Sequence, residues 1–512
     1  MEHPRHSYWH ETSHKKNDST ANKAEIVDKE FDILIIGAGL TGLNTAYLLK
    51  DSGYKIGIIE GSKIGFGTTG YTTAKITIQH DLIYDYLINS FSLQEAKQYL
   101  KANEEGINLI KKIISDNNIE CDFKEQTAYV YTTDINEIDQ LKKELHAYEK
   151  LNINGFYTNE VPLPINVEGA IGVKGQYQFN PLKYLYSLLN IIKNSKCELY
   201  EKVRALNIER NQENNKNYEY VIKTDCGNIY ANKIIVSSHY PFDNDFGLYF
   251  LRLYQEKSYI LAATTEREAF EGMFININDP IRSMKYHFSN SGPVLLLAGG
   301  NHKVGSKDNE EDSYKELEQF LKQNFKNYQI INKWSTQDCM TYDHIPYIGK
   351  YSNNIEDIYV ATGFKKWGMS HSAAAALIIS NRILGKEDDY SEVFNPSRIT
   401  PLQSAKEFAS SVGNIVTGFA KRVMPIYDQI FDVKMGEGKI VEHNGKKVGV
   451  YKDEKGDYFC INPVCRHLKC AVSFNEAEKT WDCQCHGSRY DIKGNILEGP
   501  TVLPLEKIKI KK

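Results

Sequence analysis

The sequence has little of what marks a secreted, membrane-spanning or nucleic-acid-binding protein. Its first residues, MEHPRHSYWHETSHKKNDSTANK, are polar and include no apolar segment of the kind that forms a signal peptide. No apolar run reaches the roughly 18 residues that a membrane span needs. Positive charge is not in excess either, since 62 Lys and Arg residues face 66 Asp and Glu residues, so no basic surface for nucleic acid is expected. These absences predict a soluble, cytoplasmic protein.

Changes in residue pattern along the 512 residues predict four segments. Residues 1–30 are expected to form a mobile N-terminal arm, with two aromatic side chains suited to docking. Residues 31–400 alternate strand-like apolar runs with helical stretches, which is typical of an α/β domain. Residues 401–430 repeat apolar side chains at helical spacing and are expected to form a connector helix packed on this domain, with peripheral association at a membrane surface as the alternative. Residues 431–512 contain short strands and turn signals, which predict a small all-β domain.

The stretch DILIIGAGLTGLNTAYLLKDSGYKIGIIE contains the parts of a dinucleotide-binding βαβ unit. Gly37 allows the tight turn after the first strand, Gly39 lets a pyrophosphate approach the backbone, and Gly42 allows close packing of helix and strand. Glu60 ends the second strand, where a carboxylate binds ribose hydroxyls. GFGTTG (residues 65–70) fits the same glycine pattern but has no strand immediately before it, so a second nucleotide site is not expected.

Two further stretches resemble the D-amino-acid-oxidase-like superfamily of flavoproteins, which includes glycine oxidase and sarcosine oxidase. GSKIGFGTTGYTTAKIT (residues 61–77) resembles its loop leading to the isoalloxazine, and IYVATGFKKWGMSHSAAAA (residues 358–376) resembles its C-terminal flavin-contacting segment. The resemblance implies FAD, held in a Rossmann-like domain of the glutathione-reductase and D-amino-acid-oxidase type with an α+β substrate domain inserted into it. The residues implied to bind FAD are Gly37, Gly39, Leu40, Thr41, Gly42, Glu60, Gly61, Thr68, Thr69, Thr72, Thr73, Ala74, Lys75, Val203, Gly363, Phe364, Trp367, Gly368 and Met369.

Substrate-binding residues are harder to assign than FAD-binding residues. Six candidates lie in suitable regions, although a surface or structural role is the more ordinary interpretation of each: Arg252, Tyr254, Lys257, Tyr259, Arg282 and His371. Cys339, in the stretch DCMTYDHIP, resembles the position at which sarcosine oxidases attach their flavin covalently. Because the spacing differs, a buried free thiol is the expected role of Cys339, and a covalent link to FAD is the alternative.

Five of the nine cysteines fall within 26 residues near the C-terminus, and the other four are isolated. The isolated residues are Cys121, Cys197, Cys226 and Cys339, which are expected to be buried, inert thiols. The cluster consists of Cys460, Cys465, Cys470, Cys483 and Cys485. In a chain with no export signal, such a cluster suggests metal binding before it suggests a disulfide framework.

Within this cluster, the spacing of cysteine and histidine is that of a metal site. Cys465-x-His467 is followed, after fifteen residues, by Cys483-x-x-His486, which provides two thiolates and two imidazoles. Such a set binds one tetrahedral Zn²⁺ ion. It also binds a [2Fe–2S] cluster with two Cys on one iron and two His on the other, the Rieske arrangement.

The surrounding residues resemble Rieske proteins of the cytochrome bc type. The resemblance implies a disulfide between Cys470 and Cys485 that ties the two ligand loops together. It also implies hydrogen bonds from Ser488 and Tyr490 that raise the cluster potential. GPTVLPL resembles the proline loop that shields the cluster. The departures from the family pattern, none of them at a ligand, are Lys469, Gln484 and Thr501.

The whole chain resembles a bacterial two-module family that joins a D-amino-acid-oxidase-like flavoprotein to a C-terminal Rieske domain. Flavins accept two electrons, whereas a [2Fe–2S] cluster carries one at a time. The expected function is a dehydrogenase that oxidises an amine, amino acid or related small molecule at FAD and passes single electrons to the cluster and an external carrier. The alternatives are a reductase, in which electrons flow from the cluster to FAD, and a redox sensor switched by the Cys470–Cys485 disulfide.

Overall fold

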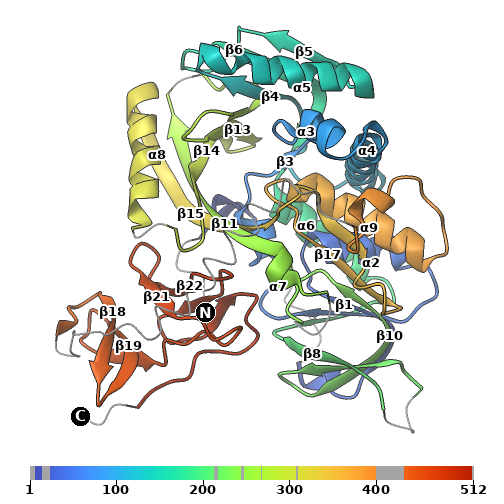
Figure 1. Cartoon of the computed structure of the whole chain (residues 1–512), viewed down its shortest axis with the longest axis vertical. Helices are drawn as coiled ribbons and strands as arrows, with labels where there is room; N and C mark the ends of the chain where they lie inside the picture. Colours follow the sequence, from blue (N-terminus) through green and yellow to red (C-terminus); the bar gives the residue numbers. More distant parts are fainter. Residues whose placement is uncertain are drawn as a thin grey trace.

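The computed structural model describes residues 6–13, 23–212, 217–243, 247–266, 268–306, 309–398 and 432–509. These residues form three parts, seen in Figure 1 as a sheet with its helices at the lower right, a second sheet above it, and a small β domain at the lower left. They are an α/β nucleotide-binding domain, an α+β domain inserted into it, and an all-β domain, which is the fold class that the sequence predicts.

The nucleotide-binding domain is built on a sheet whose central strands are parallel. Its main path contains, in spatial order, β16 (Tyr347–Lys350), β17 (Ile358–Thr362), β10 (Asn228–Val236), β1 (Glu30–Ile36), β2 (Ile56–Glu60) and β7 (Glu198–Glu201). At one edge, β9 (Tyr220–Thr224) pairs with β10, and β8 (Ala205–Arg210) pairs with β9. Ile36 at the end of β1 pairs with both Ile59 and Val236. The loops after β1, β2 and β10 therefore meet at the same edge of the sheet.

Small residues let helices approach one another closely in this domain. Helix α2 (Leu40–Leu49) packs against α9 (Gly368–Ile383) and α6 (Pro181–Lys193), and α4 (Leu93–Asp116) packs against α9. The four alanines Ala373–Ala376 of α9 are fully buried. A Cβ at Gly106 of α4 would lie 2.8 Å from the Ala374 nitrogen, so this crossing requires glycine.

The inserted domain has a largely antiparallel sheet. Its strands are, in spatial order, β15 (Tyr328–Thr341), β11 (Leu253–Thr265), β14 (Gly292–Lys303), β13 (Ser283–Ser289), β12 (Met273–Asn276), β4 (Lys124–Thr132), β6 (Gly169–Gln178) and β3 (Lys75–Ile76), with β5 (Gly155–Thr158) paired to β6. Further helices of the chain are α3 (Ile83–Ser90), α5 (Ile138–Leu151), α7 (Tyr249–Arg252) and α8 (Glu311–Asn324). Its short 3-10 turns include η2 (Thr68–Tyr71), η3 (Ile135–Glu137) and η4 (Glu392–Phe394). The long strands β11 and β15 run from this sheet toward the all-β domain (Figure 1).

The C-terminal domain consists of two small antiparallel sheets. One contains β18 (Gly438–His443), β19 (Lys446–Lys452) and β20 (Tyr458–Ile461), and the other contains β21 (Val472–Asn475), β22 (Thr480–Cys483), β23 (Arg489–Asp491) and β24 (Ile496–Glu498). Trp481, Tyr490 and Leu505 are buried in its core. The two loops that carry the cysteine and histidine motifs precede β21 and connect β22 to β23.

The N-terminal segment is not a free arm over residues 6–13, which corrects the sequence prediction there. Helix α1 (Tyr8–Thr12) buries Tyr8 and Trp9, and the Trp9 indole nitrogen donates a hydrogen bond to the Thr72 carbonyl oxygen at 2.6 Å. Further along the chain, η1 (Lys23–Ile26) leads into β1. The sequence suggested that these two aromatic side chains could dock but not where, because the surface that receives Trp9 is a loop 63 residues away.

The predicted connector helix at residues 401–430 lies outside the described residues. Among the helices that the structure does describe, none has both the length and the hydrophobicity needed to cross a membrane.

Candidate functional site

The glycines of the βαβ motif occupy positions where a side chain cannot fit. Gly37 has a φ of +107°, and a Cβ there would lie 2.6 Å from the Ser237 carbonyl oxygen. A Cβ at Gly42 would lie 2.0 Å from the Gly37 carbonyl oxygen. Gly39 precedes the first residue of α2, so the free backbone amides at this helix N-terminus face the loop. This backbone suits a pyrophosphate group at the motif.

Glu60, at the end of β2, has the position expected of a ribose-binding carboxylate. Its two oxygens accept hydrogen bonds from the amides of Ala38 at 3.1 Å and Ser62 at 2.8 Å. Burial raises the pKa of Glu60, and these two amides and the nearby Arg204 oppose that rise. The carboxylate is thus oriented by backbone amides before any ligand binds.

A cavity of about 240 Å³ opens at this motif. Of the residues implied to bind FAD, those lining it are Gly37, Gly39, Leu40, Thr41, Glu60, Gly61, Thr68, Thr69, Thr72, Val203, Phe364, Gly368 and Met369. The implied residues that do not line it among the described residues are Gly42, Thr73, Ala74, Lys75, Gly363 and Trp367. Gly65 and Gly67 of the GFGTTG stretch line the same cavity, so this stretch borders the βαβ motif.

The opposite wall of the cavity comes from the C-terminal domain, which the sequence did not predict. Residues 497–502, at the end of β24 and in the proline loop, line the cavity together with Ser237, His239 and Tyr240 from the segment after β10. No local sequence signal reports such a contact, because the two segments are more than 250 residues apart. The cavity therefore lies at the interface between the nucleotide-binding domain and the C-terminal domain.

The four predicted metal ligands come together as two like pairs. The Cys465 and Cys483 thiols share a hydrogen bond, and this bond lowers the pKa of Cys465 to about 6. The His467 and His486 rings have their centroids 5.0 Å apart. Burial lowers the pKa of His467 to about 3 and that of His486 to about 4, so both imidazoles are neutral, as metal ligation requires. Cysteine beside cysteine and histidine beside histidine is the arrangement that a [2Fe–2S] cluster of the Rieske type needs.

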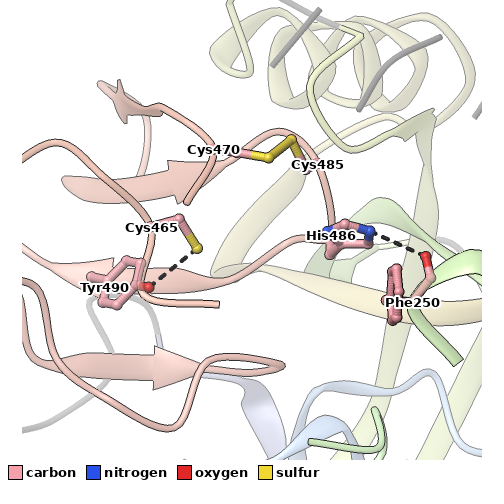
Figure 2. Close-up of a disulfide and its surroundings, with 6 residues drawn as sticks. All are labelled: Phe250, Cys465, Cys470, Cys485, His486 and Tyr490. Atoms are coloured by element: carbon pink, nitrogen blue, oxygen red, sulfur yellow. Dashed lines mark hydrogen bonds between the residues drawn. A yellow bond between two sulfur atoms is a disulfide. The ribbon is translucent and has the colours of Figure 1, made fainter. Parts of the chain in front are cut away.

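His486 presents one nitrogen to the metal site and one to the flavoprotein domain. Its Nε2 lies 3.1 Å from the backbone carbonyl oxygen of Phe250, drawn in Figure 2. Since a carbonyl only accepts, Nε2 carries the proton and Nδ1 has the free lone pair. Nδ1 is buried and has no hydrogen-bond partner among the described residues. This orphaned nitrogen fits an iron ligand.

The loops that hold these ligands are joined and hydrogen-bonded as the resemblance implies. Cys470 and Cys485 form a disulfide, with their Cα atoms 6.6 Å apart (Figure 2). The Tyr490 hydroxyl lies 3.4 Å from the Cys465 Sγ and accepts a hydrogen bond from the Arg466 amide. Ser488 also contributes a hydrogen bond that lowers the pKa of Cys465. Both hydroxyls thus stabilise negative charge on the Cys465 sulfur.

None of the six substrate candidates lines the cavity among the described residues. Arg252 stacks on the Tyr347 ring at 4.1 Å, Tyr254 stacks on Tyr342, and Arg282 pairs with Glu316 at 3.0 Å. The Tyr259 hydroxyl and His302 Nε2 lie 3.0 Å apart, and buried His371 lies 3.1 Å from the Tyr99 hydroxyl. Each of these five side chains is thus engaged with neighbouring protein groups.

Lys257 has a different role from the catalytic one considered in the sequence, because it joins the two domains. It is 1% exposed, and its Nζ lies 2.9 Å from Glu478 and 3.4 Å from Asp482 of the C-terminal domain, with Glu310 as a third partner. Burial opposes its charge, yet the carboxylates outweigh burial and raise the pKa of Lys257. Arg489, also 1% exposed, pairs with Glu478 and Asp482. A buried ion network therefore fixes the C-terminal domain to the flavoprotein domain.

Two lysines, Lys75 and Lys285, lie close together in the inserted domain. From the sequence, Lys75 was assigned to FAD binding and Lys285 was not identified. Lys285 is 1% exposed and donates to the Gln178 side-chain oxygen at 2.8 Å, and Lys75 donates to the Ser283 hydroxyl at 2.6 Å. Burial lowers the pKa of Lys75 to about 8, and burial together with Lys75 lowers the pKa of Lys285 well below its usual range. The carboxylate of Asp81 is near enough to Lys75 to oppose the lowering of its pKa in part.

Cys339 is a buried thiol in β15 and does not line the cavity among the described residues, although its neighbour Asp338 does. Burial raises the pKa of the Cys339 thiol, which keeps it protonated. Its environment therefore matches the expected free thiol.

Fold and site together define the class of protein. Residues 32–382 match the family model of the FAD dependent oxidoreductases, and residues 426–509 match that of the Rieske [2Fe-2S] domain. The chain belongs to the FAD dependent oxidoreductase family and carries a Rieske domain at its C-terminal end. It is an oxidoreductase that binds FAD and a [2Fe–2S] cluster, which confirms the predicted cofactors and decides against zinc.

Similar proteins cover either both modules or one. The putative Rieske 2Fe-2S iron-sulfur protein YhfW of Bacillus subtilis (strain 168) is 39% identical over 482 residues, which are 94% of each chain. The cytochrome b6-f complex iron-sulfur subunit of Chlorobaculum tepidum is 39% identical over 80 residues, 16% of this chain and 44% of that protein. Glycine oxidase from Geobacillus kaustophilus has the same fold over 72% of this chain and 99% of its own, with a TM-score of 0.61 and 16% identity.

Proposed function

We propose that the protein is a dehydrogenase whose two cofactors work in series. A small amine, amino acid or related substrate is oxidised at FAD, and its electrons pass singly to the Rieske cluster and then to an external carrier. Bound FAD supplies two-electron chemistry, whereas the cluster supplies one-electron steps.

The observation that carries this proposal is the shared cavity. Gly37 and Gly39 of the FAD motif line one wall, and Gly499 and Pro500 of the Rieske domain line the other. On the Rieske side, Pro500 directly precedes Thr501, whose amide donates a hydrogen bond at 3.2 Å to Ser488 beside the cluster ligand Cys465. The two cofactor sites are thus separated by one layer of residues, an arrangement that favours electron exchange within the chain.

The pair Lys75 and Lys285 supports a substrate with a negative group, such as an amino acid. A buried ammonium is costly unless an anion compensates it or it loses its proton. A substrate carboxylate would supply that anion. The hydrogen-bond acceptors of the two amines are neutral, namely the hydroxyl of Ser283, the amide of Gln178 and the carbonyl oxygen of Ala74. The one nearby carboxylate that affects Lys75 is that of Asp81, which is not hydrogen-bonded to it among the described residues. Glycine oxidase, whose fold this chain shares, is itself named for an amino acid.

An anaerobic titration tests the function. The purified holoprotein is mixed with a panel of amines and amino acids while the flavin absorbance and the EPR signal of the reduced cluster are followed together. A substrate should bleach the flavin and produce the cluster signal on the timescale of turnover. A reduced flavin beside a cluster that stays oxidised would contradict the proposal.

The same titration separates the two alternatives. A cluster midpoint potential well below that of the flavin would favour electron flow from the cluster to FAD. If no electron moves between the cofactors, and opening the Cys470–Cys485 disulfide at cellular redox potentials instead changes the conformation, the protein is a sensor.

The variant Lys285→Met tests the proposed substrate class. Benzoate serves as a carboxylate probe whose binding is read from the flavin spectrum. Lys285→Met should weaken benzoate binding by about tenfold or more, since one charged hydrogen bond is worth about 1.5 to 3 kcal/mol. Lys124→Met is the matched control, because Lys124 lies on the same sheet but pairs with Glu271 at the surface. Equal affinities for both variants would remove the lysine pair from the substrate site.

A further inference from the structure

Tyr240 lies between the two cofactor sites. It follows β10 and lines the cavity at the FAD motif. Its ring centroid is 6.4 Å from that of His467 and 6.5 Å from that of His486, with interplanar angles of 76° and 75°. One aromatic ring therefore meets both imidazoles of the cluster site edge to face and also borders the nucleotide site.

The hydroxyl of Tyr240 has an unusual environment. The side chain is 3% exposed and packs in an apolar cluster, and its hydroxyl has no hydrogen-bond partner among the residues that the structure describes. A buried hydroxyl without a partner is costly, so native structures rarely keep one. A ligand in the cavity that Tyr240 lines would offer that partner.

The contact between Tyr240 and the cluster ligands is fixed in place. His486 Nε2 donates to the Phe250 carbonyl oxygen at 3.1 Å, and the Gln337 side-chain amide donates to the Gly487 carbonyl oxygen at 2.9 Å. Gly487 packs so tightly that a Cβ there would lie 3.0 Å from Gln255. These bonds tie the histidine loop to β11, β15 and the helix α7 of the flavoprotein domain, and the network around Lys257 reinforces them. The two imidazoles thus lie against Tyr240, which lines the cavity, without any domain movement.

We propose that Tyr240 is the bridge through which single electrons cross between FAD and the Rieske cluster. This rests on the proposed function, in which the two cofactors exchange electrons. In each crossing one electron leaves the reduced flavin and one ferric ion of the cluster becomes ferrous. Two crossings re-oxidise the flavin, the proton that it loses goes to water, and a one-electron external carrier re-oxidises the cluster after each crossing. Tyr240 itself is neither oxidised nor deprotonated; its ring lies in the tunnelling path between the two sites and strengthens the electronic coupling there.

The ring and the hydroxyl make separable contributions. Tyr240→Phe keeps the ring that contacts both imidazoles, whereas Tyr240→Leu removes it. Tyr342→Leu is the matched control, because Tyr342 is a buried aromatic residue close enough to Tyr240 to influence it electrostatically. It stacks instead on Tyr254 and does not line the cavity among the described residues.

The experiment measures electron transfer directly in the holoproteins. Deazaflavin with EDTA generates a one-electron donor by flash photolysis, and the flavin and cluster absorbances are followed as the electron equilibrates between them. FAD content, iron content, the EPR g-values and the cluster midpoint potential are measured for every variant. These readouts separate a loss of the path from a change in driving force or in cluster structure.

We expect Tyr240→Leu to slow the transfer by about tenfold or more, equivalent to about 1.4 kcal/mol in the barrier, at unchanged midpoint potential. Tyr240→Phe and Tyr342→Leu should stay near the wild-type rate. A fully loaded Tyr240→Leu protein with the wild-type rate would overturn the inference. Should that variant lose a cofactor, Tyr240→Met takes its place and the same comparison decides. Wild-type protein that shows no transfer at all would instead contradict the proposed function.

Discussion

His486 Nε2 and the carbonyl oxygen of Phe250 lie 3.1 Å apart, and this bond joins a cluster ligand to the flavoprotein domain. Because the carbonyl accepts, the imidazole keeps its proton on Nε2 and offers Nδ1 to iron. A main-chain acceptor also means that the bond survives substitution of the Phe250 side chain. The orientation of a metal ligand is therefore set by the packing of one domain on the other.

Lys257→Met should loosen that packing. Loss of Lys257 leaves Glu478, which is fully buried, with one partner fewer. Removing one partner of a buried ion pair costs about 3 to 5 kcal/mol. We expect a lower free energy of unfolding in urea and faster proteolysis between the two domains. Lys112→Met removes a surface pair with Asp116 on α4 and should change neither quantity; a similar loss in both variants would argue against the network.

The affinity for FAD should fall as pH rises through neutrality. Burial raises the pKa of Asp338, which lines the cavity, to about 7. In the FAD-free protein this carboxyl is neutral below that pH and negative above it, where it repels the anionic pyrophosphate. The dissociation constant measured by flavin fluorescence should therefore rise above pH 7, by at most about tenfold per pH unit for one linked proton. Asp338→Asn should abolish this dependence, and a wild-type constant that is flat from pH 6 to 8 would contradict the assignment.

The disulfide should stabilise the cluster rather than the flavin site. The Cys470–Cys485 disulfide closes a loop of 15 residues that includes the ligand Cys483, and a loop of this length is worth about 3 kcal/mol in the chain-entropy account. The double variant Cys470→Ala, Cys485→Ala should lose its cluster absorbance at lower temperature or urea concentration. Its FAD should be released at the wild-type midpoint. Simultaneous loss of both cofactors would show that the two modules unfold as one unit.

Tyr490→Phe should lower the reduction potential of the cluster. The Tyr490 hydroxyl lies 3.4 Å from Cys465 Sγ, and a hydrogen bond to a charged group contributes about 1.5 kcal/mol or more. Reduction adds negative charge to the cluster, so the lost bond should shift the midpoint downward by about 65 mV, since 59 mV corresponds to about 1.4 kcal/mol for one electron. Protein-film voltammetry measures the shift. Tyr458→Phe, on the exposed strand β20, serves as the control, and an unchanged potential in Tyr490→Phe would exclude a role for the hydroxyl.

The two cofactor sites could be predicted from local patterns in the sequence. Gly37, Gly42 and Glu60 could be predicted because a βαβ unit places them by strand and helix geometry within 30 residues. The spacing of Cys465, His467, Cys483 and His486 predicted a metal site, and the resemblance to Rieske proteins implied the cluster and the Cys470–Cys485 pair. Such patterns can be recognised in the sequence because the residues of each motif lie close together along the chain.

Contacts across the fold were decided by tertiary structure alone. Lys257 was a substrate candidate in the sequence, and only the docked Rieske domain reveals its two buried carboxylate partners there, Glu478 and Asp482. The sequence predicts that Trp9 belongs to a mobile arm, and only its contact with the loop at Thr72 explains why it is buried. Tyr240 carries no motif at all. Its position between His467, His486 and the cavity arises from segments more than 200 residues apart, and no local pattern encodes which distant surfaces bury each other's apolar and charged groups.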